Sequence, residues 1–110
     1  FRDPSWLRED VYAILRAHGA ALCVHDLIER HPDVSTAGWV YYRFHGVRYG
    51  GTYSARRLAG QARRLAAHVR DGRDVYAFFN NDAGGRAVRN ALDLKRRMAE
   101  ALHAGAAKAA

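Results

Sequence analysis

The sequence predicts an α/β fold in which parallel strands alternate with helices. Short apolar runs that end in polar residues alternate along the chain with segments of helical periodicity, and strands separated by crossovers of this kind pair in parallel. Hydrophobic residues make up 49% of the chain, which excludes a disordered tail. A length of 110 residues allows one small domain, or part of a larger one.

The N-terminal part predicts a helix followed by a strand. Asp3 can cap a helix whose first position suits Pro4, and Gly19 predicts its end. Apolar residues recur between them at helical spacing, at Leu7, Val11, Ile14 and Leu15. The apolar run Ala20–His25 predicts the first full strand, and residues 27–38 predict a loop because proline and glycine interrupt them.

Residues 39–45 predict a second strand with two different faces. Val40, Tyr42 and Phe44 alternate with Tyr41, Arg43 and His45, so one face is apolar and the other carries a cation and an imidazole. The apolar face can pack under helices. The glycine-rich and tyrosine-rich loop that follows, residues 47–53, is a candidate lid.

The C-terminal part predicts a helix, a third strand and a last helix. Ser54 can cap the first of these helices, and Asp71-Gly72 predicts its end. The strand covers residues 74–79, and the last helix begins after Gly84-Gly85. We predict that residues 104–110 form a disordered alanine-rich tail, which places the domain at residues 1–103.

Charge and cysteine content limit the classes of partner and compartment. The net charge is +7, almost entirely from arginine, which suits phosphate, carboxylate or nucleic acid as a partner and is equally typical of a solvated helix face. The single cysteine, Cys23, excludes an intrachain disulfide and fits a reducing, cytoplasmic location. The longest apolar run is too short to span a membrane.

Four ordered motifs resemble those of the YecE-like family, also named domain of unknown function 72. Phe-Arg-x-Pro-Ser-Trp stands at residues 1–6 and Tyr-x-Arg-x-His-Gly at residues 41–46. The other two combine Tyr53-Ser54 with Leu58, and Phe79-Asn80-Asn81 with Ala87 and Asn90-Ala91. Since members of that family resemble (β/α)₈ barrels of more than twice this length, the resemblance implies the C-terminal half of a TIM-type barrel.

The resemblance also assigns each strand a place in that barrel. Phe1-Arg2 would end the fifth strand, and Ala20–His25, Trp39–His45 and Asp74–Asn80 would be the sixth to eighth strands. Three full strands cannot close a barrel. We therefore expect the missing N-terminal half, or a second copy of the chain, to cover the sheet edge.

Every strand in this reading ends in polar or ionisable residues, at the place where barrels build active sites. We assign catalytic roles to His45, Arg43 and His25: His45 as general acid or base, Arg43 as the ligand of an anionic group, and His25 as a further polar group. The candidate substrate contacts are Arg2, Asp26, Tyr49 and Tyr53.

The turn after the third strand is a candidate anion site. Its glycines allow backbone N–H groups to converge, and the start of the following helix favours negative charge, although Asp82 opposes it. The residues assigned to this site are Asn80, Asn81, Gly84, Gly85 and Arg86.

The cofactor stays unknown at this point. His25, Asp26 and His45 are suitable metal ligands, but no short ligand spacing supports a metal site. Our leading hypothesis is an enzyme of hydrolase or lyase type that acts on an anionic or phosphorylated substrate. Two alternatives stay open: a non-catalytic module that binds nucleic acid, and a half-barrel that is inactive without its other half.

Overall fold

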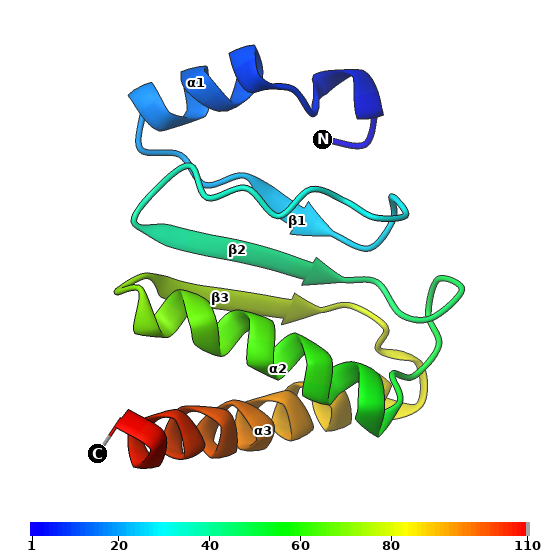
Figure 1. The fold of residues 1–110 in the computed structure, drawn as a ribbon. Coiled ribbons are helices and arrows are strands. Elements are labelled where there is room, and N and C mark those ends of the chain that lie inside the picture. The colour runs from blue at the N-terminus through cyan, green and yellow to red at the C-terminus, as the bar shows by residue number, and fades with distance from the viewer. Residues whose placement is uncertain (110) are drawn as a thin grey trace.

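The computed structural model describes residues 1–109, and the side chains of residues 1–106. Its elements follow one another as helices and strands of one small α/β unit (Figure 1). In chain order these elements are η1 (Pro4–Trp6), α1 (Glu9–Ala17), β1 (Cys23–His25), β2 (Trp39–Phe44), α2 (Ala55–Arg70), β3 (Asp74–Phe79), η2 (Ala83–Gly85) and α3 (Arg86–Ala109).

The three strands form one parallel sheet in the order β1-β2-β3, which confirms the predicted topology. His25 pairs with Arg43, and Arg43 pairs with Phe78 on the other side. Residues paired in this way point to the same face of the sheet. Because the three strands run in parallel, their carboxyl ends lie at one edge of the sheet. The carboxyl ends of the strands therefore share a common mouth.

The connection between β1 and β2 is a loop without a helix, as the sequence predicts. The hydroxyl of Thr36 fixes its end: it accepts from the N–H of Leu22 at 2.9 Å and donates to the carbonyl of Ala20 at 2.6 Å. These contacts replace strand pairing before Cys23, so β1 is shorter than the predicted run Ala20–His25. In consequence, the connection from β1 to β2 contributes no helix to the outer face of the sheet.

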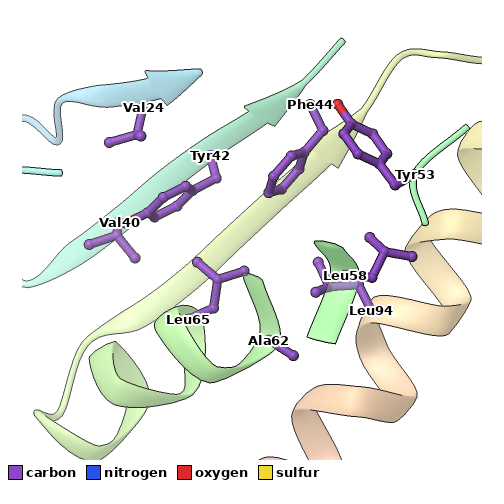
Figure 2. Close-up of a cluster of buried hydrophobic side chains, with 9 residues drawn as sticks. All are labelled: Val24, Val40, Tyr42, Phe44, Tyr53, Leu58, Ala62, Leu65 and Leu94. Carbon is purple, nitrogen blue, oxygen red and sulfur yellow. The ribbon is translucent and has the colours of Figure 1, made fainter. Parts of the chain in front are cut away.

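The core lies between one face of the sheet and the pair α2 and α3, which pack against each other and against β3 (Figures 1 and 2). The alternating apolar residues of β2 point into this core, as predicted, and meet the apolar stripe of α2. Figure 2 shows its buried side chains: Val24, Val40, Tyr42, Phe44, Tyr53, Leu58, Ala62, Leu65 and Leu94.

The opposite face of the sheet carries exposed aromatic side chains. Trp39, Tyr76 and Phe78 are 37%, 49% and 53% exposed, and the rings of Trp39 and Tyr76 meet edge to face at 5.9 Å. A closed barrel buries residues at such positions in its interior. This face therefore has the character of the inner wall of a barrel of which the chain supplies only part.

The first helix begins later than predicted. Asp3 does act as a cap, since its side chain accepts from the N–H of Ser5, but it caps only the single turn η1. The backbone of Arg8 is extended, with φ −148° and ψ 163°, and α1 starts after it. Glu9 and Asp10 then occupy the first turn of α1, where acidic groups favour the helix dipole.

The last helix continues through residues 104–109, where the sequence predicts a disordered tail. Alanine has the highest helix propensity of all residues, which favours continuation of the helix here. Arg70 of α2 also reaches this end of α3, where it donates to the carbonyl of Ala101 at 2.7 Å. Residue 110 lies outside the described residues, and the boundary at residue 103 stays a prediction. Within residues 1–109, no helix has both the length and the apolar character needed to cross a membrane.

Candidate functional site

The predicted catalytic residues lie together in a small cavity at the carboxyl ends of β1 and β2. We name it the mouth pocket. Its volume is about 160 Å³. It is lined by Phe1, Arg2, Cys23, His25, Leu27, Arg43 and His45. The structure thus brings His45, Arg43, His25 and Arg2 to one place from three separate segments of the chain.

A hydrogen-bond network behind the pocket holds His45. The backbone N–H of His45 donates to Oδ1 of Asp26 at 2.8 Å, and its Nδ1 lies 3.1 Å from the same oxygen. The hydroxyl of Tyr53 donates to Oδ2 of Asp26 and accepts from the N–H of Gly46 at 2.7 Å. Asp26, which Tyr53 holds in turn, therefore positions the imidazole, and the substrate contacts that we predicted at both residues stay a prediction.

The contact with Asp26 assigns the proton of the neutral His45 ring to Nδ1. The other ring nitrogen, Nε2, forms no hydrogen bond with any residue in the described part of the chain. A neutral imidazole in this tautomer offers Nε2 as a proton acceptor. Tyr49 stacks on the same ring, with centroids 6.3 Å apart and planes 14° apart, while its side chain is largely exposed.

His25 uses both of its ring nitrogens within the protein. Its Nδ1 accepts from the N–H of Leu27 at 3.2 Å, so Nε2 carries the proton and donates to the carbonyl of Phe1 at 2.7 Å. The ring thereby ties the N-terminal segment and the β1 loop to the mouth pocket. This placement favours a positioning role for His25 over the catalytic role that we predicted.

Arg43 brings an unsatisfied donor to the pocket. Its Nε is buried and has no hydrogen-bond partner among residues 1–109. A buried N–H without an acceptor costs about 1–3 kcal/mol, so an acceptor from a ligand or from another chain segment would bind favourably here. Cys23 lines the same cavity, and burial raises the pKa of its thiol, which keeps it protonated at neutral pH.

The network makes the stability of the protein sensitive to alkaline pH. Burial, and then the hydrogen bond to Asp26, raise the pKa of Tyr53, and burial with a hydrogen bond to Asp33 raises the pKa of Tyr42. The folded state therefore favours the neutral phenols. The stabilisation that these phenols provide is complete below pH 10, where they are neutral in both the folded and the unfolded chain. It decreases above pH 10, as the phenols of the unfolded chain ionise.

We predict that the free energy of unfolding decreases from pH 10 upward, and that Tyr53→Phe makes this decrease shallower. Urea unfolding between pH 8 and pH 11 measures how steeply the free energy of unfolding falls with pH. This slope is compared, and not the free energy itself, because the variant also loses a hydrogen bond. Tyr76→Phe, on the exposed sheet face, is the matched control. An unchanged slope in Tyr53→Phe would contradict the raised pKa.

The residues that we predicted as an anion site after β3 do not line the mouth pocket. Asn81 is buried, and its amide donates to the carbonyl of Gly51 and to Oδ1 of Asn90, each at 2.9 Å. Arg86 donates to the carbonyl of Gly50 at 3.3 Å. These residues hold neighbouring loops together, while Asn80, Gly84 and Gly85 are exposed.

The loop of residues 47–51, part of the candidate lid, is a closed turn. The N–H of Gly50 donates to the carbonyl of His45 at 2.8 Å, and Val47 and Gly51 form an isolated bridge. The clamp between Asn81 and Asn90, which supports this turn, was not found by sequence reasoning. Neither asparagine has a local pattern that indicates such a contact over nine positions.

The metal alternative gains no support from the geometry. Among the residues that the structure describes, no three histidine, cysteine or carboxylate side chains converge as a metal-binding group. His25, His45 and Asp26 are adjacent, but His25 has both nitrogens engaged and Asp26 holds His45. Of the donor set that we considered from the sequence, only Nε2 of His45 is without an internal hydrogen bond among the described residues.

Comparisons with known proteins agree on one family. A family profile described as "Protein of unknown function DUF72" matches residues 1–110. A DUF72 family protein from Thermotoga maritima is similar in structure with a TM-score of 0.75 at 30% identity, over 87% of this chain and 43% of that chain. One from Enterococcus faecalis has a TM-score of 0.73 at 20% identity, over 89% of this chain and 45% of its own.

The chain thus spans less than half the length of either solved structure. A search of curated proteins finds no match.

Proposed function

The chain belongs to the DUF72 family, whose function is unknown, and on that premise we propose that the mouth pocket is the active site of an enzyme for anionic substrates. The observation that carries this proposal is the pair of Asp26 and His45, with Arg43 in the same cavity. The reaction class that suits these groups is hydrolysis or elimination, in which a base removes a proton from water or from the substrate.

In this mechanism His45 is the general base. Asp26 holds the proton on Nδ1 and stabilises the imidazolium that forms when Nε2 takes up a second proton. Tyr53 donates to the other carboxylate oxygen and so fixes the orientation of Asp26. The same imidazolium can then return the proton to a leaving group, so one residue serves as base and acid in turn.

Arg43 binds the anionic group of the substrate. Its guanidinium carries the buried Nε that lacks an acceptor, and a phosphate or carboxylate oxygen would satisfy it. Arg2 lines the same cavity and adds a second positive charge from the N-terminal segment. The site therefore combines a fixed cation with an oriented base, which is the minimum that the proposed chemistry requires.

The mouth pocket would be completed by the remaining strands of a barrel. Both solved relatives have chains more than twice as long as the part they share with this one. The exposed face with Trp39, Tyr76 and Phe78 is the surface that such an N-terminal half would cover. A cytoplasmic location also belongs to the proposal, because the single cysteine Cys23 fits a reducing compartment.

The test uses turnover of 4-nitrophenyl phosphate as an anionic probe and 4-nitrophenyl acetate as a neutral one. We expect His45→Gln to lower kcat by about 10²-fold or more, as for the loss of a general base. Arg43→Gln is expected to lower kcat/KM about tenfold for the phosphate ester, with a smaller effect on the acetate ester.

His18→Gln is the matched control, because His18 is exposed at the end of α1 and lies outside the mouth pocket. Circular dichroism of each variant confirms that it folds. If His45→Gln turns over both esters as fast as His18→Gln does, the proposed role of His45 is wrong.

A further inference from the structure

A second and larger cavity lies on the outer face of the sheet, where the loop between β1 and β2 leaves room. We name it the outer groove. Its volume is about 690 Å³, within the range of about 300–1,000 Å³ that is usual for small-molecule sites. Its floor contains Val24, Tyr42 and Phe44, which point to the helix side of the sheet, away from the inner face that carries Arg43.

One wall of the groove is a single face of α2. Arg57, Gln61 and Arg64 are four and three residues apart, so they align on that face of the helix. Two of them are held by aromatic rings: Cζ of Arg57 lies 5.1 Å from the ring centroid of Tyr53, and Cζ of Arg64 lies 4.8 Å from that of Tyr42. Stacking of this kind fixes a guanidinium plane and leaves its N–H edges free to bind.

Two arginines from loops line the same groove in an unusual backbone conformation. Arg30 and Arg48 have φ values of 55° and 50°, in the left-handed region that favours glycine. Each such conformation costs about 1–2 kcal/mol for a residue with a side chain. Arg48 shares this conformation with Tyr49 in the closed turn of residues 47–51, and both arginines line the one cavity.

The positive charge of the groove is only partly compensated by the protein. Arg64 pairs with Asp33, with Nε and Oδ2 3.2 Å apart. Within residues 1–109, no carboxylate forms an ion pair with Arg30, Arg48 or Arg57. Two acidic residues line the groove as well: Asp26 is already engaged by His45 and Tyr53, while Glu29 is exposed, as are the three arginines.

We propose that the outer groove binds a small molecule that carries two or more phosphate groups. Three unpaired guanidiniums around one cavity call for more than one negative charge, and the planar fork of arginine matches phosphate oxygens. The apolar floor would receive the uncharged part of the ligand. The outer groove opens on the helix side of the sheet and the mouth pocket on the inner face, and the two cavities meet at the strand ends, where His25, Leu27 and Arg43 line both.

The sequence contains a signal for this site that we interpreted differently. The arginines of the helix at residues 55–70 are typical of a solvated face, and Arg56, Arg63 and Arg70 are indeed exposed. Arg57 is exposed as well, and Arg56, Arg63 and Arg70 repeat at the same spacing of seven residues, so Arg57 and Arg64 stand out only by the aromatic rings that they meet. Those aromatic partners belong to other elements, so the spacing alone could not identify the groove.

The experiment titrates the chain with inorganic pyrophosphate by isothermal calorimetry. We expect one site, and we expect Arg57→Gln to weaken the affinity about tenfold or more, because a charged hydrogen-bond donor is lost. Arg48→Gln should act in the same direction. Arg57→Lys keeps the charge but loses the fork, so it should weaken binding to an intermediate degree and provides a test if Arg57→Gln does not fold.

Arg56→Gln is the matched control, since it removes the same charge from the neighbouring position of α2 and lies outside the groove. It should change the affinity by no more than about twofold, as for an exposed charge. Three results would overturn the proposal: no binding of pyrophosphate, equal losses in Arg56→Gln and Arg57→Gln, or a loss in His45→Gln with none in Arg57→Gln. The last result would place the anion in the mouth pocket.

Discussion

Gly46→Ala is expected to lower the free energy of unfolding by about 3 kcal/mol or more. The backbone of Gly46 has a φ of 101°, which residues with a side chain rarely adopt. A Cβ atom there would lie 2.7 Å from the N of Gly50, 2.7 Å from the O of Gly51 and 2.8 Å from the Cβ of Asn81. None of these atoms is the end of a flexible side chain, so the backbone itself would have to move.

Gly84→Ala separates the two causes of this cost. Gly84 also has a positive φ, of 64°, but a Cβ atom would meet nothing within 4 Å. We expect it to lose only about 1 kcal/mol, which is the cost of the left-handed backbone alone. Urea unfolding at pH 7 measures both variants, and similar losses in the two would show that the packing around Gly46 is looser than the structure indicates.

Asp26→Ala is expected to have the second-largest effect, with a loss of about 3 kcal/mol. The carboxylate accepts hydrogen bonds from the backbone N–H of His45, from Nδ1 of His45 and from the hydroxyl of Tyr53. Alanine leaves all three donors without an acceptor in a largely buried place. Asp26→Asn keeps one carbonyl oxygen toward His45 and should cost less. Only the oxygen that accepts from the Tyr53 hydroxyl is replaced, by an amide NH2 group.

Two measurements check this prediction. Urea unfolding gives the loss of stability, and ¹⁵N NMR of the His45 ring reports which nitrogen carries the proton. In Asp26→Ala the ring should no longer favour the Nδ1 tautomer. If Asp26 only stabilised another part of the fold, the tautomer would not change. Glu29→Ala removes an exposed carboxylate from the same loop and is the control; equal losses in both variants would contradict the network.

Much of the fold could be predicted because local patterns coincide with tertiary packing. The alternation in residues 39–44 identified the buried face of β2, and the interruption by Pro32 and Gly38 identified the loop that follows β1. The late start of α1 could not be found from caps alone. Asp3 and Pro4 form a valid helix start, and only the extended backbone at Arg8 shows that this start ends after one turn.

The candidate site could be predicted in its location but only partly in its roles. Parallel strand ends meet at one edge, so the clustering of His45, Arg43 and His25 follows from topology. Which groups hold the others depends on contacts across the fold. Asp26 and Tyr53 are 27 positions apart, and no local pattern shows that the Tyr53 hydroxyl would hold the carboxylate that contacts the imidazole.

The thiol of Cys23 offers a site for covalent labelling of the mouth pocket. It is the one cysteine of the chain, and its raised pKa slows alkylation and air oxidation at neutral pH. A small maleimide probe applied near neutral pH, where amines react far more slowly than thiols, would therefore attach slowly but at this one position of the cavity. Spectra of such a labelled sample would report the filling of that cavity by any molecule, with no need to know the reaction in advance.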